Sequence, residues 1–267
     1  MRRVARATST AYRGFCVLCR VMPTPERYAV LVVGHVPPAF LEQYGDYATM
    51  YQQLLKEGPH EQWDVYKCIE NEFPDEPVLD SYRGYVIGGS RHDAHSDLEW
   101  IVKLRQLIKT IYERKKSNLL GVCFGHQVIA HSLGGLSGRA TGWQVGLQEV
   151  TATDAAKSRF PTLPPKLNLL KIHRDQVNKL PPGAELLAKS ANTPIEMFSL
   201  GDRVLCVQSH PEFNCDIVQR LVETRTKDGS IPPDVAQGAI SSMSGRGPEV
   251  SELTAVLREF LKTDHSK

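Results

Sequence analysis

Short runs of apolar and β-branched residues recur along the chain, with longer amphipathic stretches between them. The apolar runs, bounded by glycine, proline or charge, predict strands over 28–33, 64–69, 84–87, 119–123 and 204–208. The amphipathic stretches predict helices over 40–57, 97–115, 125–133 and 215–226. This alternation predicts an α/β fold with a mainly parallel central sheet and helices on both faces. Ligands bind such sheets at the carboxyl ends of the strands.

The second half of the chain has a different pattern. Shorter, more polar runs predict strands over 147–150, 167–172, 185–189 and 196–198, which we expect to form a small antiparallel extension of the main sheet. Residues 232–267 predict two helices, broken at Gly245-Arg246-Gly247-Pro248. The expected organisation is therefore a disordered basic extension over 1–25, an α/β domain over 26–228 and a helical tail over 229–267.

Composition narrows the classes of partner. The 267 residues are 41% hydrophobic, and 32 basic against 30 acidic side chains give a formal net charge of +2. A chain of this length and composition can bury a sizeable core, while the near-zero net charge gives no overall attraction for nucleic acid or an anionic membrane. Because no apolar run reaches roughly 18 residues, we expect no membrane-spanning helix.

The N-terminus and the cysteines bear on localisation. Residues 1–25 carry several arginines and no acidic residue before Glu26, which is typical of an organelle transit peptide; initiation at Met22 would remove most of this stretch. The six cysteines are scattered in a chain too long to need disulfide staples, which favours a reducing compartment such as the cytosol. Cys16 and Cys19 have no second pair at zinc spacing, so we expect no metal there.

One cysteine stands where a predicted strand runs into a helix. Gly121-Val122-Cys123-Phe124-Gly125 places glycine two residues away on both sides of the cysteine, as in the nucleophile elbow Gly-x-Ser-x-Gly. Such a sharp turn leaves no room for Cβ atoms beside the nucleophile, and the positive end of the following helix favours a thiolate. The alternative is a buried strand cysteine with incidental glycines.

A base for this thiol follows the last predicted strand of the main sheet. In Ser209-His210-Pro211-Glu212 the histidine and the glutamate lie two residues apart, so that in an extended segment both side chains point the same way. Glu212 can then orient the His210 imidazole and stabilise its cation, as the acid of a catalytic triad does. His-Pro-Glu alone is more typical of a surface loop, so the prediction depends on its pairing with Cys123.

An oxyanion hole is the third expected part. Gly88 and Gly89 end another predicted strand, where bare backbone can approach a substrate and direct an N–H at a developing oxyanion. The N–H of Phe124, directly after the nucleophile, is the second candidate donor. Taken alone, two adjacent glycines would indicate an ordinary tight turn.

The order of these motifs resembles the class I glutamine amidotransferases, over roughly residues 27–225. Gly138-Arg139-Ala140, Gly142-Trp143-Gln144 and His173-Arg174-Asp175 agree with that family. Within it, the sequence looks most like the γ-glutamyl peptidases of plants that trim glutathione conjugates. The shared segments are Glu-Phe-Pro-Asp-Glu (72–76), Ser-x-His-Asp-Ala (90–94), Cys-Phe-Gly-His-Gln (123–127) and Glu-Met-Phe-Ser (196–199).

The resemblance implies a flavodoxin-like catalytic domain over 26–228 that cleaves a γ-glutamyl amide through a thioester. It implies that Gln127 and the backbone near Trp143 hold the charged ends of the glutamyl group, although Gln127 could equally be a helix-face residue. Many members carry proline after the oxyanion glycine, whereas Ser90-Arg91 follows here, so Arg91 meets either a substrate carboxylate or solvent. No histidine set has metal-ligand spacing and no glycine-rich loop fits ATP or NAD, so we expect no cofactor and no metal.

Three functions remain open from the sequence. The first is a cysteine hydrolase that cleaves glutathione or its conjugates, with a small γ-glutamyl molecule as its partner. It is favoured because the glutaminase-like region occupies most of the chain. The second is a glutaminase subunit that supplies ammonia to a separate synthase, and the third is a catalytically silent binding protein.

Overall fold

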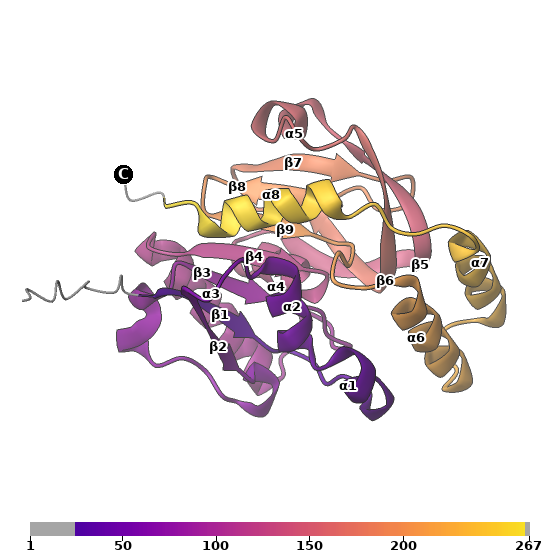
Figure 1. The fold of residues 1–267 in the computed structure, drawn as a ribbon, viewed down its shortest axis with the longest axis horizontal. Coiled ribbons are helices and arrows are strands. Elements are labelled where there is room, and N and C mark those ends of the chain that lie inside the picture. The colour runs from indigo at the N-terminus through magenta and orange to yellow at the C-terminus, as the bar shows by residue number, and fades with distance from the viewer. Residues whose placement is uncertain (1–24, 265–267) are drawn as a thin grey trace, which may run out of the picture.

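The computed structural model describes residues 25–264. Within that range a single nine-stranded sheet has the order β2-β1-β3-β4-β9-β8-β7-β5-β6 (Figure 1). The extension predicted over residues 1–25, with Cys16, Cys19 and Met22, lies outside the described residues except for Pro25. Among the described helices none has the length and apolar character needed to cross a membrane.

The first half of the sheet is parallel, as predicted. Its strands are β1 (Glu26–Leu31), β2 (Glu61–Tyr66), β3 (Gly84–Ile87), β4 (Asn118–Val122) and β9 (Val204–Val207). β3, β4 and β9 are buried along their whole length, which explains why each reads as a continuous apolar run rather than an alternating one. β4 pairs with β3 on one side and β9 on the other, so their carboxyl ends meet at one edge.

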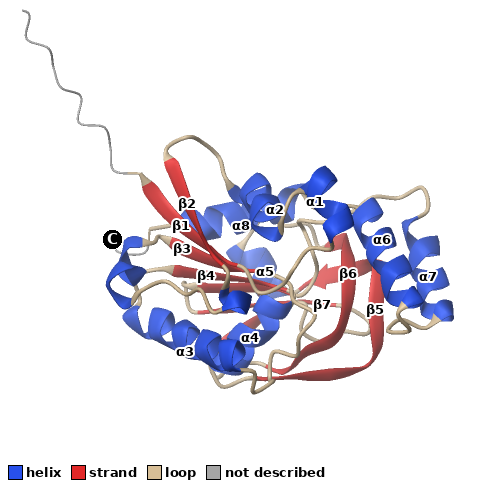
Figure 2. Ribbon diagram, turned by 90° about the horizontal axis from the view of Figure 1, so that it is seen from below, coloured by secondary structure: helices blue, strands red, loops and turns tan. Residues whose placement is uncertain are grey.

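Helices cover both faces of this sheet (Figure 2). One face packs against α2 (Tyr47–Leu55) and α8 (Ser251–Lys262), and the other against α3 (Glu99–Arg114) and α4 (Phe124–Ser132). The two faces bury separate apolar clusters. The α/β architecture with helices on both faces is thereby confirmed, and α8, from the predicted tail, is part of its core.

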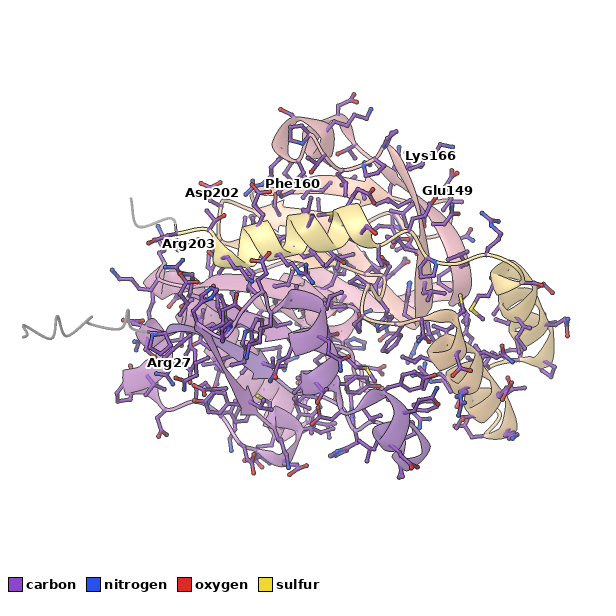
Figure 3. All side chains as sticks on the ribbon, in the orientation of Figure 1. Arg27, Glu149, Phe160, Lys166, Asp202 and Arg203 are labelled. Carbon is purple, nitrogen blue, oxygen red and sulfur yellow. The ribbon has the colours of Figure 1, made fainter. Side chains whose placement is uncertain are left out.

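The antiparallel extension is confirmed, with longer strands than predicted. It contains β5 (Leu136–Ala152), β6 (Lys166–Lys179), β7 (Ala184–Lys189) and β8 (Met197–Leu200), and it includes a register shift between Arg139 and Gln144. Polar and glycine positions interrupt the apolar pattern of β5 and β6, so the prediction recovered only part of each strand. The ion pair between Glu149 and Lys166, at 2.8 Å, joins β5 to β6 (Figure 3).

Helices α6 (Cys215–Lys227) and α7 (Pro233–Met243) pack on β5 and β6, and the short α5 (Asp154–Arg159) follows β5. Two 3₁₀ segments, Cys68–Glu70 and Glu76–Ser81, lie between β2 and β3.

The continuous helix predicted over 40–57 was wrong. The chain forms α1 (Pro38–Tyr44) and then α2, because Gly45 takes a positive φ of 75° and Asp46 caps the second helix. The Asp46 carboxylate accepts a hydrogen bond from the Thr49 N–H at 2.7 Å. A glycine followed by a capping aspartate is a stop and a start signal within one amphipathic stretch.

Candidate active site

The nucleophile elbow forms between β4 and α4. Cys123 precedes the first residue of α4 and has φ +54°, a conformation that L-residues rarely adopt. The flanking glycines are sterically required: a Cβ on Gly121 would lie 2.7 Å from the Gly125 backbone, and one on Gly125 would lie 2.0 Å from the carbonyl oxygen of Ile87. The sequence prediction of a strained strand-to-helix turn at Cys123 thus agrees with the geometry.

His210 and Glu212 point together, as their spacing predicts. His210 Nδ1 lies 2.8 Å from Glu212 Oε1, and both side chains are buried. The imidazole stacks on the Phe213 ring, with centroids 4.3 Å apart. The backbone N–H of His210 donates a hydrogen bond to the Leu170 carbonyl at 2.9 Å. These contacts fix the ring plane, while His210 Nε2 is buried without a hydrogen-bond partner in the structure.

The imidazole of His210 lies beside Cys123. A Cβ placed on Gly89 would lie 3.1 Å from His210 Cε1 and 4.0 Å from Cys123 Cβ, so both side chains border the same glycine. Burial lowers the pKa of His210, but the negative charges of Cys123 and Glu212 outweigh it and raise that pKa to about 10. The arrangement therefore favours the imidazolium form of His210 near neutral pH.

The two glycines after β3 lie beside the elbow. The Gly125 N–H donates to the Gly88 carbonyl at 2.9 Å, which ties the first turn of α4 to this loop. Phe124 is the first residue of α4, so its N–H has no acceptor within the helix. The backbone of Gly89 and Phe124 thus lies beside Cys123, where the sequence predicts an oxyanion hole.

A cavity with two lobes opens at Cys123. The polar lobe, of about 330 Å³, is lined by charged and polar side chains: Ser90, Arg91, His92, Asp93, Gln127, Arg139, Trp143, His173, Arg174, Asp175, Arg225 and Ser230. The apolar lobe, of about 440 Å³, is lined mainly by Val36, Pro37, Pro38, Tyr47, Ile69, Ile172, Phe213 and Leu221. Cys123, Arg91 and Arg225 border both lobes, so the nucleophile stands where the lobes meet.

Arg225, on α6, is a site residue that the sequence prediction missed. It is partly buried, lies over the Trp143 ring at 5.9 Å, and forms no ion pair with a carboxylate among residues 25–264. Burial lowers its pKa. Arg91, by contrast, is exposed and pairs with Asp228 at 3.1 Å. Of the two arginines, Arg225 has the guanidinium available for an anionic ligand.

The predicted substrate-binding residues Gln127 and Trp143 both line the polar lobe. Gln127 is buried, and its amide nitrogen donates to the Asp175 carbonyl at 2.7 Å and to Gln208 Oε1 at 3.1 Å. Its amide therefore links α4 to β6 and to the segment after β9. The Gln127 amide nitrogen thus makes both of its hydrogen bonds within the protein.

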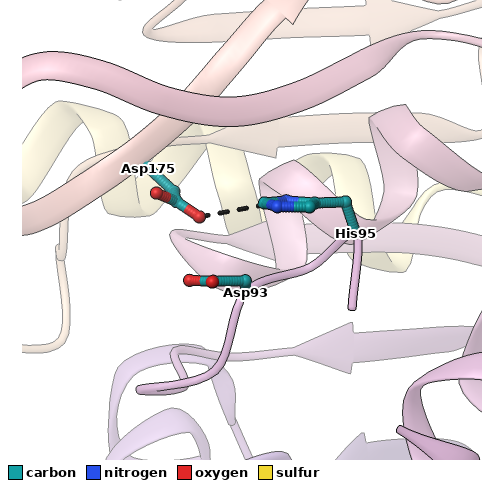
Figure 4. A group of neighbouring side chains, drawn as sticks. All are labelled: Asp93, His95 and Asp175. Atoms are coloured by element: carbon teal, nitrogen blue, oxygen red, sulfur yellow. Dashed lines mark ion pairs between the residues drawn. The ribbon is translucent and has the colours of Figure 1, made fainter. Parts of the chain in front are cut away.

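A cluster of Asp93, His95 and Asp175 borders the polar lobe (Figure 4). Their ligand atoms lie within 4.8 Å of one another, and His95 Nδ1 is 4.0 Å from Asp175 Oδ2. Arg139 pairs with both carboxylates, at 2.9 Å from Asp175 and 3.2 Å from Asp93. Burial and the neighbouring Asp93 raise the pKa of Asp175. The Arg139 cation thus offsets part of the negative charge of these two acids.

Comparison with known proteins identifies the family. Residues 51–220 match the family model of the class I glutamine amidotransferases. γ-Glutamyl peptidase 3 of Arabidopsis thaliana is 37% identical over 91% of this chain and 99% of its own, and γ-glutamyl peptidase 4 is 37% identical over 84% and 90%. A solved glutamine amidotransferase from Thermotoga maritima superposes with a TM-score of 0.66 at 21% identity, covering 89% of this chain and 96% of its own.

The chain therefore belongs to the class I glutamine amidotransferase family, as the motifs indicated, and it is a hydrolase. The structural match supports the flavodoxin-like fold.

Proposed function

We propose that the chain cleaves the γ-glutamyl amide bond of glutathione or of its S-conjugates, with Cys123 as nucleophile. The observation that carries this proposal is the meeting of a polar and an apolar lobe at Cys123. A γ-glutamyl group has an amino and a carboxylate group, which suit the polar lobe and Arg225, whose guanidinium pairs with no carboxylate among residues 25–264. The leaving group of glutamine is ammonia, which needs no apolar lobe of about 440 Å³. An S-conjugated dipeptide would use it, and the γ-glutamyl peptidase relatives support the same choice.

In the proposed mechanism, Cys123 and His210 cleave the γ-glutamyl amide in two steps. The Cys123 thiolate attacks the γ-carbonyl carbon, and the backbone N–H groups of Gly89 and Phe124 stabilise the oxyanion. The His210 imidazolium gives its proton to the leaving amine as the C–N bond breaks, leaving a glutamyl thioester. Neutral His210 then takes a proton from water, which attacks the thioester and releases glutamate. Glu212 keeps the imidazole oriented in both steps.

The direct test is glutamate release by the purified chain from glutathione, from an S-benzyl conjugate of glutathione and from glutamine. The proposal predicts that the two peptides are cleaved, with a higher kcat/KM for the conjugate than for glutamine. Release from glutamine alone, or release only after a synthase is added, would instead favour an ammonia-supplying subunit.

A pair of matched variants tests the apolar lobe. Val36 lines that lobe, whereas Val65 lies on the edge strand β2 and is 40% exposed. Val36→Glu should raise KM for the S-benzyl conjugate about tenfold or more, because burying a polar group without a hydrogen-bond partner costs roughly 1 to 3 kcal/mol. Val65→Glu should leave KM unchanged. Equal effects of the two substitutions would contradict the assignment of the lobe.

A further inference from the structure

Tyr51, on α2, contacts Glu212, the acid of the proposed triad. Its hydroxyl donates a hydrogen bond to Glu212 Oε1 at 2.7 Å, and the residue is only 1% exposed. The same oxygen lies 2.8 Å from His210 Nδ1. Glu212 Oε2 is buried and has no partner in the structure. The carboxylate thus has two donors, His210 and Tyr51, and both reach one oxygen.

The Tyr51 ring also supports the oxyanion loop. A Cβ on Gly88 would lie 2.4 Å from Tyr51 Cε2, so the ring packs directly against the glycine backbone. Tyr51 lines neither lobe of the cavity, and it therefore has no route to a substrate. One side chain joins the acid of the triad to the loop that carries Gly89.

We propose that Tyr51 is a positioning residue that shares Glu212 with His210 and thereby limits how strongly the carboxylate holds the imidazolium proton. A donor on Oε1 withdraws part of the negative charge that would otherwise act on His210 alone. Without the Tyr51 hydroxyl, Glu212 would hold the His210 imidazolium more strongly and make it a weaker acid. Catalysis would suffer, because His210 must release this proton to the leaving amine. The pKa of the Tyr51 hydroxyl is raised well above its usual value by burial and by Glu212, so the hydroxyl remains a donor.

Other titratable or charged side chains lie around Tyr51, Glu212 and His210. They are Cys123 on the elbow, Tyr47 on α2, His173 on β6, Arg225 on α6, and Arg91 in the loop after β3. Burial raises the pKa of Tyr47 to about 12 and lowers the pKa of His173 to about 3, so both are neutral between pH 6 and pH 11. Titration of an imidazolium in that range therefore belongs to His210.

The inference rests on the Cys–His–Glu assignment of the proposed function, but its test needs no substrate. The rate of Cys123 alkylation by iodoacetamide is followed against pH, with the modified peptide identified by mass. Tyr51→Phe should move the upper transition, in which the imidazolium loses its proton, to higher pH by about half a unit or more. Tyr85→Phe is the matched control, because its buried hydroxyl donates to the Leu79 carbonyl at 2.8 Å, away from the site.

Two further measurements complete the test. In a Glu212→Gln background, Tyr51→Phe should cause no additional shift, because the shared carboxylate is gone. With a cleaved substrate, Tyr51→Phe should lower kcat about tenfold, as expected for a lost hydrogen bond to a charged group, and leave KM unchanged. An unchanged upper transition, a shift to lower pH, or the same shift in Tyr85→Phe would overturn the proposal, whichever γ-glutamyl compound is the substrate.

Discussion

The N–H of Gly125 donates a hydrogen bond to the carbonyl oxygen of Gly88 at 2.9 Å, which fastens the helix after the nucleophile to the loop of the oxyanion hole. This close approach exists only because Gly125 has no side chain, since its Cβ would lie 2.0 Å from the Ile87 carbonyl oxygen. β3 and α4 thus lie so close together that a methyl group on Gly125 would force them apart.

We predict that Gly125→Ala destabilises the protein by about 1 to 3 kcal/mol or more, since 1 to 3 kcal/mol is the usual cost of overpacking a well-packed interior. The free energy of unfolding from urea titration measures it. Gly238→Ala is the control, because Gly238 lies in α7 with no atom near its Cβ position. That substitution should stabilise by up to about 1 kcal/mol through helix propensity. A Gly125→Ala protein as stable as wild type would contradict the packing described.

Glu212→Gln should lower kcat about 10²- to 10⁴-fold, because the amide cannot stabilise the His210 imidazolium and favours the wrong tautomer. KM should change little, since Glu212 does not line the cavity. Steady-state kinetics with glutathione measure both constants. Glu249→Gln, at an exposed carboxylate bonded to Asn168, is the control and should retain wild-type kcat. A large rise in KM with normal kcat would show that Glu212 binds substrate instead.

Arg225→Met should raise KM for γ-glutamyl peptides about 10- to 100-fold, because a charge-assisted hydrogen bond to a carboxylate is worth roughly 1.5 to 3 kcal/mol. Arg220→Met is its matched control on the same helix, since Arg220 pairs with Asp216 and does not line the cavity. The expected outcome is a KM effect confined to Arg225. Normal KM values in both variants would remove Arg225 from the binding site.

The elbow, the His–Glu pair and the glycine loop were all readable from the sequence, because each depends on residues within a few positions of one another. Arg225 left a weaker signal: it continues the buried face of Ile217, Leu221 and Val222 in α6, where a cation is unusual. Tyr51 left none. Its spacing with Ala48 and Leu55 indicates an ordinary core position, and its partner is 161 residues away. Contacts across that separation become visible only once the sheet brings α2 and the segment after β9 together.

Three buried histidines predict an optimum in stability near pH 6.5. Burial lowers the pKa of His126 and of His173 to about 3, so the stability that they contribute while neutral is lost as the pH falls below their unfolded value. Each contributes a slope of up to about 1.4 kcal/mol per pH unit there. The pKa of His210 is raised to about 10, so its contribution is complete below pH 6.5 and is lost as the pH rises towards 10. Urea unfolding from pH 5 to pH 9 measures both slopes, and a flat profile would contradict these environments.

In the proposed mechanism, Cys123 carries the glutamyl group during turnover. The most direct measurement is the intact mass of the protein, quenched in acid during turnover of glutathione, with the modified peptide mapped. We predict an added glutamyl group on the peptide that contains Cys123, its loss on treatment with hydroxylamine, and neither adduct nor glutamate release in Cys123→Ala. Turnover retained in Cys123→Ala, or an adduct on another residue, would contradict the account.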